Sequence, residues 1–216
     1  MGNILRRHDI APAPKRSQTT TWKDFIRAHM STLAGSDFFT AEVITWHGLV
    51  TYYVLFFLHL DSRRVSIAGI TNHPESCWME QMARNATLEG WGFLHSRRYV
   101  LHDRDAKFSG SFRDTLTAGG VKPLKLPARS PNLNAFAERW VRSVKEECLS
   151  KLILFGEASL RRALEEYVEH FHAERNHQGK GNVLLFPNFD TTAGSGRVRC
   201  KERLGGLLKY YHRDAA

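Results

Sequence analysis

Three carboxylates in this sequence lie in surroundings that suit metal-assisted chemistry. Asp37 opens the strand-like run in "GSDFFTAEV", Asp103 directly follows "RYVLH", and Glu138 lies near the start of "SPNLNAFAERWVRSVKEECL". Clustered carboxylates repel one another unless they share a divalent cation, and Mg²⁺ prefers oxygen ligands. Two such ions at a phosphodiester activate the attacking oxygen and stabilise the leaving one. If the three acids converge, phosphoryl transfer is the chemistry they predict.

The elements that must position these acids follow from the hydrophobic pattern. Five short runs predict strands, at residues 37–45, 49–60, 63–71, 98–102 and 121–127. Helical segments separate the third strand from the fourth and the fourth from the fifth. The order β-β-β-α-β-α-β, followed by the helix of Glu138, predicts an α/β fold with a mixed five-stranded sheet flanked by helices. If strands one and four are neighbours, Asp37 and Asp103 meet, and the late helix can lay Glu138 beside them.

The chain divides into three regions. Residues 1–34 read as a basic arm or linker with a short helix, because "APAPKR" and "QTTT" interrupt them. The compact domain is expected at 35–189 and ends with an amphipathic helix at about 157–174. A basic Gly- and Arg-rich tail is expected at 190–216. A length of 216 residues suits one well-packed core with extensions.

The charge balance indicates a polyanionic partner. Lys and Arg number 31 against 22 Asp and Glu, a net charge of +9. Nucleic acid is favoured over a membrane, because no stretch reaches the roughly 18 uncharged apolar residues that a membrane span needs. The start of the chain, "MGNILRRHDIAPAPKR", also lacks the apolar core of a signal peptide. We therefore expect a cytoplasmic protein.

The helix of Glu138 permits two interpretations of that residue. At about 100° per residue, an apolar stripe should face the core. Its members are Leu133, Phe136, Ala137, Trp140, Val144 and Cys148. Glu138 shares another face with Arg142 and Lys145. On this helix alone, an exposed ion-pair ladder of ~0.3 kcal/mol per pair explains the glutamate as well as a metal site does.

Other acids compete for a place in the cluster. Asp105 lies two residues beyond Asp103, so strand alternation points both side chains to the same side and does not choose between them. Asp61, in "HLDSRRV", lies between two adjacent strands and is predicted to be a turn residue.

Histidines gather in "EHFHAERNHQ", at His170, His172 and His177. Zinc is one interpretation, but the segment has no cysteine and no HxxxH pair. Packing and polar contacts with the backbone are favoured, and the role of the cluster stays open.

In this order of motifs the sequence resembles the DDE transposases and retroviral-type integrases, and more narrowly the bacterial insertion-sequence transposases with an integrase core. The resemblance runs from about Trp22 to Pro187. It rests on "SDFF", "LDSRRV", "HDRDAKF", "SPNLNAFAERWVRSVKEECL" and "HFHAERNHQGKGNVLLFP". Asp103 and Glu138 are separated by 34 residues, close to the family's fixed interval, whereas Asp105 leaves only 32.

The resemblance implies an RNase H-like fold in which Asp37, Asp103 and Glu138 are the catalytic residues. They are also implied to be the ligands of two Mg²⁺ or Mn²⁺ ions. The implied activity is DNA strand cleavage and strand transfer in recombination and integration. Implied partners are double-stranded DNA, as transposon ends and target, and further copies of the chain on that DNA, with the protein associated with a bacterial nucleoid.

The same helix is then expected to contact DNA. Arg139, Arg142 and Lys145 would bind its phosphates. Asn132 is predicted to be the N-cap, and Asn134 is balanced between a structural role and a substrate contact. Because "MGNILRR" resembles the end of a helix-turn-helix module, the chain is expected to lack that N-terminal domain.

Three alternatives remain at this point. An RNase H-like nuclease would use the same acids. A catalytically idle, truncated transposase remnant would bind DNA nonspecifically. A generic basic domain would have no metal site at all.

Overall fold

The computed structural model describes residues 21–127, 134–187 and 196–213. The chain forms two units, Met1–Met30 and Ser31–Ala216. In the first unit the described helix is α2 (Trp22–His29), which Thr21 caps by accepting a hydrogen bond from the Asp24 amide at 3.2 Å. Within the described part of the chain, no helix is both long and apolar enough to span a membrane.

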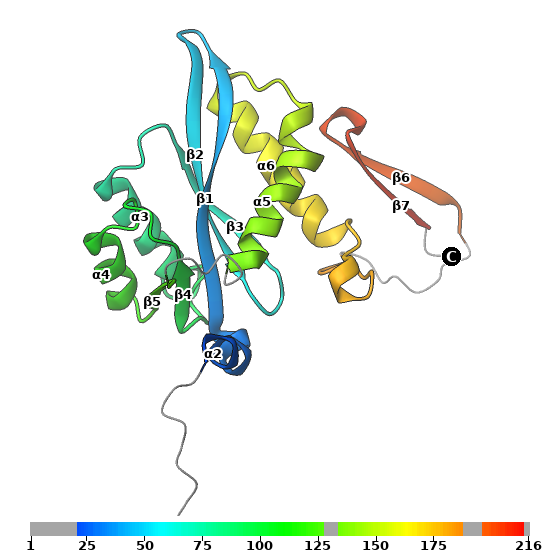
Figure 1. The fold of residues 1–216 in the computed structure, drawn as a ribbon. Coiled ribbons are helices and arrows are strands. Elements are labelled where there is room, and N and C mark those ends of the chain that lie inside the picture. The colour runs from blue at the N-terminus through cyan, green and yellow to red at the C-terminus, as the bar shows by residue number, and fades with distance from the viewer. Residues whose placement is uncertain (1–20, 128–133, 188–195, 214–216) are drawn as a thin grey trace, which may run out of the picture. The chain divides into compact units, whose positions relative to one another are not determined.

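The second unit contains a five-stranded sheet and four longer helices (Figure 1). Its strands are β1 (Leu33–Thr45), β2 (Gly48–His59), β3 (Val65–Thr71), β4 (Tyr99–His102) and β5 (Lys122–Lys125). The helices are α3 (Ser76–Thr87), α4 (Gly110–Ala118), α5 (Ala135–Glu147) and α6 (Gly156–Ala173). Short 3₁₀ turns are η1 (Met30–Thr32), η3 (Leu149–Lys151), η4 (Gln178–Lys180) and η5 (Leu204–Gly206). The predicted order of elements is confirmed.

The sheet has the strand order β3-β2-β1-β4-β5. β1 and β3 both pair antiparallel with β2, while β4 pairs parallel with β1 and with β5. The predicted mixed sheet, with strands one and four as neighbours, is therefore confirmed. The prediction that Asp37 opens its strand is wrong: β1 begins at Leu33, because residues 33–35 pair with β4 and continue the pairing with β2.

Helices cover both faces of the sheet, with α3 and α4 on one face and α5 and α6 on the other (Figure 1). Strand alternation separates the two cores. Leu55 and Phe57 of β2 join the core under α3 and α4. Phe56 faces the other way, and its ring lies 4.4 Å from that of Trp140 on α5, between ring centroids. Both rings are fully buried, so this pair is a principal contact of α5 with the sheet.

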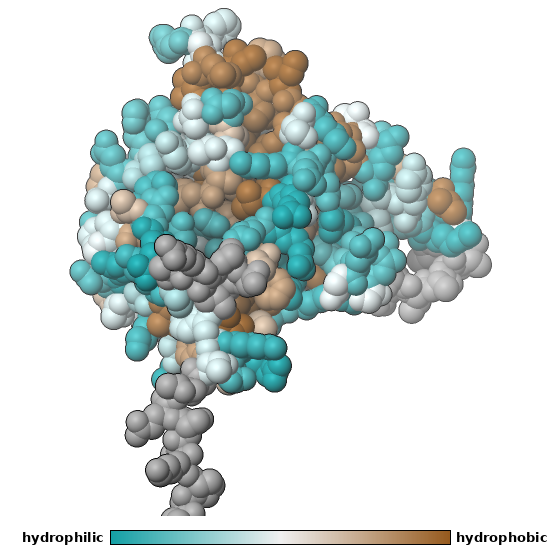
Figure 2. All heavy atoms as spheres, in the orientation of Figure 1, coloured by the Kyte–Doolittle hydropathy of each residue, from teal (hydrophilic) through white to brown (hydrophobic). Residues whose placement is uncertain are grey.

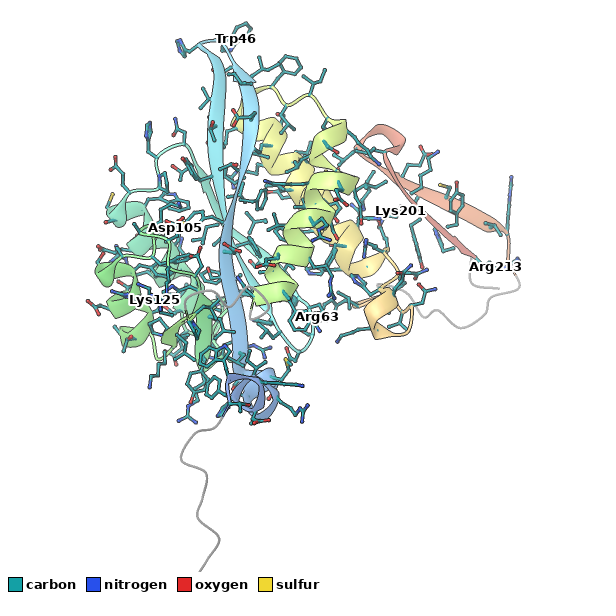
Figure 3. All side chains as sticks on the ribbon, viewed as in Figure 1. Trp46, Arg63, Asp105, Lys125, Lys201 and Arg213 are labelled. Carbon is teal, nitrogen blue, oxygen red and sulfur yellow. The ribbon has the colours of Figure 1, made fainter. Side chains whose placement is uncertain are left out.

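No secondary structure was predicted for the basic tail, yet part of it forms a hairpin. β6 (Val198–Arg203) and β7 (Leu208–Arg213) pair antiparallel. Arg203 donates to both carboxylate oxygens of Glu174, just past α6, at 2.7 and 2.8 Å. Lys201 pairs with the same carboxylate at 2.8 Å (Figure 3). The segment "VRCKER" lacks the alternation of apolar and polar residues that is typical of a strand, because most of its side chains are charged. Ion pairs at the end of α6 hold the hairpin in place of apolar packing.

Figure 2 shows hydrophobic side chains gathered at the end of the β1–β2 hairpin. The Ile44 amide there donates to the Leu154 carbonyl at 2.9 Å, which brings the η3–α6 connection beside the hairpin. Exposed apolar residues at this end are Ile44, Trp46, Leu49, Ile153 and Phe155.

The Phe56–Trp140 contact gives a first prediction. Replacing Phe56 by alanine should lower the free energy of unfolding by about 3–5 kcal/mol, because it leaves a cavity beside Trp140. Chemical denaturation followed by circular dichroism measures this loss. Trp46→Ala is the matched control, because the Trp46 side chain is 102% exposed and its removal should change stability by less than about 0.5 kcal/mol. Equal losses in the two variants would contradict this description of the core.

Candidate active site

Strand alternation directs Asp37 towards α5. Its neighbour Phe38 packs against the core under α3 and α4, so the side chains of Asp37 and Phe39 leave β1 on the opposite face. The Phe39 ring meets the Trp140 ring there, with 5.7 Å between centroids. Asp37 is half-buried, and its Oδ1 accepts a hydrogen bond from the Phe38 amide at 2.8 Å.

The parallel pairing of β1 with β4 brings Asp103 level with Asp37. Gly35 lies opposite Leu101, and the same register two residues further on aligns Asp37 with Asp103, just beyond the end of β4. The loop at this point is held locally. Nδ1 of the buried His102 donates to the Asp103 carbonyl at 2.7 Å, and the Asp105 amide donates to Asp103 Oδ1 at 3.0 Å.

Glu138 lies in the first turn of α5, on the exposed side of the helix. The apolar stripe is buried as predicted at Ala137, Trp140, Val144 and Cys148. Phe136 is half-buried, and the predicted stripe residue Leu133 lies outside the described residues. This packing fixes the rotation of α5 about its axis, so the direction in which Glu138 leaves the helix is also fixed.

Asn134 connects the start of α5 to β1. It occupies the N-cap position without a side-chain capping bond, is only 7% exposed, and donates from Nδ2 to Asp37 Oδ2 at 3.4 Å. A side chain at Gly35 would place its Cβ 3.0 Å from Asn134 Oδ1, so glycine leaves the room that the amide uses. Of the two roles weighed for Asn134, these contacts favour the structural one. The N-cap predicted at Asn132 lies outside the described residues.

The negative charges of Asp103 and Glu138 act on Asp37. The pKa of Asp37 is raised from 3.8 to about 6, chiefly by burial and also by the negative charges of Asp103, Glu138 and Asp105, while the hydrogen bond from the Phe38 amide lowers it. The carboxylates from β1, from the loop after β4 and from α5 therefore act on one another, as the sequence analysis expected of a shared cleft.

The competing acids have other partners. Burial raises the pKa of Asp105, but hydrogen bonds from Lys107 more than offset this, and Lys107 Nζ lies 2.5 Å from Asp105 Oδ2. The strand-alternation argument for Asp103 and Asp105 was wrong, because β4 ends at His102 and both acids lie in the following loop. Asp61 lies in the β2–β3 turn, as predicted, and pairs with Arg97 at 3.3 Å.

The ion-pair interpretation of Glu138 finds no support in the described residues. Arg139, Arg142 and Lys145 are exposed on α5, and none of them pairs with an acid in the described part of the chain. Pairs with the same i,i+4 spacing do form elsewhere, as between Arg161 and Glu157 at 2.7 Å. The cations of α5 therefore keep their charges available.

The histidine cluster is occupied by polar contacts. His170 Nδ1 lies 3.2 Å from Glu174 Oε2, His172 Nε2 accepts from the Val65 amide at 2.9 Å, and His177 Nε2 donates to the Phe171 carbonyl at 2.7 Å. Burial lowers the pKa of His172 to about 4, with a further contribution from the charge of Arg64. These contacts confirm the favoured interpretation of packing and polar contacts.

The acid cluster suits Mg²⁺ or Mn²⁺ by its donor chemistry. Its side chains offer carboxylate oxygens, and neither Asp103 nor Glu138 is paired with a cation among the described residues. Within the same residues, no group of three or more His, Cys, Asp or Glu is already assembled around a common metal position.

Sequence reasoning missed two supporting residues. It did not assign His102, although the position directly before Asp103 is visible in "HDRD", and it did not foresee the contact between Asn134 and Asp37. No sequence signal predicts the second contact, because it depends on how α5 docks on β1.

The raised pKa of Asp37 gives a second prediction. The folded chain keeps a proton on Asp37 up to about pH 6, whereas the unfolded chain releases it near pH 3.8. The folded state therefore binds more protons in this window, and its stability falls as pH rises. In metal-free buffer, Asp37→Asn should be more stable than the wild type by about 1–2 kcal/mol above pH 6, and the difference should vanish below pH 4.

Denaturant titrations across this pH range measure the effect. Asp114→Asn on the exposed face of α4 is the control and should show no such window. A stability difference for Asp37→Asn that does not change with pH would contradict the electrostatic description of the cluster.

Comparison with known proteins gives matches of two kinds. The model of a protein family described as "Integrase core domain" matches residues 120–183, a region that includes Glu138 and α5 but neither aspartate. No curated protein matches the sequence.

Solved structures of integrases share the fold. The magnesium complex of the HTLV-2 integrase catalytic core domain superposes with a TM-score of 0.52 at 15% identity in its dimeric form, covering 69% of this chain and 91% of that one. Its trimeric form gives 0.52 at 14% identity, covering 71% and 93%. The simian T-cell lymphotropic virus intasome, in complex with PP2A regulatory subunit B56 gamma, gives 0.52 at 12% identity, covering 85% and 67%.

The mixed five-stranded sheet and its flanking helices match those integrase catalytic cores and have the RNase H-like fold that the sequence predicted. Together with the family model, they agree with the resemblance found in the sequence: residues 120–183 are similar to an integrase core domain, and the fold is that of integrase catalytic cores.

Proposed function

We propose that this chain is a catalytic core that cleaves and joins DNA strands, with Asp37, Asp103 and Glu138 as its catalytic residues. The observation that carries the proposal is the placement of these acids on β1, just after β4 and on α5, near enough that the charges of Asp103 and Glu138 contribute to the raised pKa of Asp37. These acids come from three different elements. A fold that gathers repelling charges loses stability by doing so, and a shared cation is the usual reason.

The three carboxylates would hold Mg²⁺ or Mn²⁺, and the proposal assigns two ions. When bound, the ions supply Lewis acidity to the attacking and leaving oxygens of a phosphodiester. The protein's part is to keep the ligands in place. Asn134 holds one oxygen of Asp37, and His102 holds the backbone of Asp103. These contacts reduce the rearrangement needed when a metal binds.

Duplex DNA is the proposed substrate, both as the element end and as the target. Arg139, Arg142 and Lys145 lie on the same helix as Glu138, exposed and without acidic partners among the described residues. They are proposed to bind phosphates, which positions the strand without reading its sequence. An assembly of several copies on DNA is part of the proposal, since solved structures similar to this chain include dimeric and trimeric forms and an intasome.

Substitutions in the triad test the proposal. Asp103→Asn and Glu138→Gln should each abolish Mg²⁺- or Mn²⁺-dependent joining of a supplied DNA end to a target plasmid, because each removes a metal ligand. Nonspecific DNA binding should remain, since it depends on cations that contact phosphates. Gel analysis of plasmid products and anisotropy with a labelled duplex measure the two properties separately.

Two controls sharpen this test. Asp114→Asn should leave joining unchanged, and Asp105→Asn should reduce it far less than Asp103→Asn does. Mg²⁺ should also raise the melting temperature of the wild type but not that of Glu138→Gln, which reports binding without activity. Joining by Glu138→Gln at the wild-type rate would remove that residue from the site, and cleavage without joining by the wild type would favour a nuclease.

A further inference from the structure

A basic cleft lies beside α5, away from the acid cluster. The β2–β3 turn, α5 and the segment after α6 enclose a volume of about 550 Å³. Among its described lining residues are Arg63, Arg139 and Lys180, with no aspartate or glutamate. Such a lining offers positive charge and hydrogen-bond donors to whatever enters.

Arg63 lines the cleft with an unusual backbone conformation and, within the residues that the structure describes, an unpaired side-chain donor. Its backbone adopts a positive φ of 66°, and its guanidinium carbon lies 3.1 Å from the centre of the Phe136 ring (Figure 3 labels Arg63). Nη1 is buried and has no hydrogen-bond partner in the described part of the chain. The pKa of Arg63 is lowered to about 10, chiefly by burial and also by the charge of Arg139, while the charge of Asp61 raises it. The structure therefore keeps two mutually repelling cations together, one of them with an unused donor.

The other side of the cleft adds a third cation that forms no ion pair among the described residues. Lys180 Nζ donates to the carbonyl of Asp61 at 2.7 Å, a bond that fixes the ammonium without cancelling its charge. Trp140 also lines the cleft, and its Nε1–H finds no acceptor among the described residues. Arg175 differs, because Glu147 neutralises it at 2.6 Å. An anion in the cleft would satisfy donors and relieve repulsion at the same time.

We propose that this cleft binds the phosphodiester backbone of a DNA strand as a second anchor beside the acid site. The inference rests on the proposed function and extends it. Arg139 directly follows Glu138, so the two side chains leave α5 about 100° apart. A strand whose scissile phosphate lies at Glu138 can cross α5 and continue into the cleft. Backbone phosphates fit the lining better than a single small anion, because the cations come from three separate segments.

Salt dependence of DNA binding tests the anchor. In a Glu138→Gln chain, which cannot join DNA if the proposed function holds, affinity for a labelled duplex of arbitrary sequence is measured by anisotropy over a range of salt. Arg63→Gln and Lys180→Gln should each reduce the slope of log K against log salt by about 0.9, one phosphate contact each. Lys122→Gln on β5 is the matched control, exposed and remote from the cleft lining, and should leave the slope unchanged.

Crosslinking gives a readout that does not depend on affinity. The exposed Cys77 and Cys200 are replaced by serine, and Ser143, which lines the cleft, by cysteine. A duplex whose backbone phosphate carries a tether ending in an activated mixed disulfide should exchange with Cys at this position and release the leaving thiol, and Lys180→Gln should reduce the yield several-fold. The control chain without Ser143→Cys, which keeps the exposed Cys77 on α3 and the buried Cys148, should give background yield. Melting curves of every variant identify any that fail to fold, and Arg63→Met or Lys180→Met, which keeps an unbranched apolar stem, then replaces it in the salt series.

Unchanged salt slopes together with background crosslinking at position 143 would overturn the inference. A different result would refute the proposed function without deciding whether DNA binds in the cleft. Joining by Glu138→Gln would refute the triad, whereas the slopes and crosslinks would still decide whether DNA occupies the cleft.

Discussion

The short parallel pairing between β1 and β4 is the constraint on which the candidate site depends. Only residues 33–35 of β1 pair with residues 99–101 of β4, yet this register decides that Asp37 and Asp103 come level. A shift by one residue would turn one of the two side chains to the opposite face of the sheet. The complete burial of Leu33, Ala34, Val100 and Leu101 opposes such a shift, because it would expose apolar surface. The site is thus positioned by apolar packing some residues away from its acids.

The acids themselves weaken the fold that carries them. Asp37 is half-buried beside two other carboxylates, and its raised pKa means that ionisation at neutral pH destabilises the folded state. This loss is offset by the packing of α5, where Trp140 lies against Phe39 and Phe56. Tight apolar packing next to carboxylates that repel one another is expected at a functional site, where a protein gives up stability for its function.

Much of the fold and of the candidate site could be predicted from the sequence. The strands of the meander and the stripe through Trp140 and Val144 follow from short-range periodicity, and the interval from Asp103 to Glu138 follows from the family resemblance. The remainder depends on docking. Asn134 contacts Asp37 across 97 positions of sequence, and the basic cleft around Arg63 is formed by three distant segments. No local sequence pattern predicts either feature. The β6–β7 hairpin was missed for another reason: Arg203 and Lys201 attach it to Glu174 by charge, which hydrophobic periodicity does not detect.

Helix α5 explains why one element can serve several purposes. Its buried stripe fixes the rotation of the helix, and that rotation then assigns every other side chain to a direction. Glu138 takes the direction of the aspartates, while Arg139, one residue on, takes that of the cleft with Arg63. Arg142 and Lys145 share a face with Glu138 yet form no ion pair with it among the described residues, whereas Arg139 leaves the helix in another direction. Because adjacent residues of a helix diverge by about 100°, Glu138 and Arg139 stay apart, and under the proposed function one DNA strand would contact both.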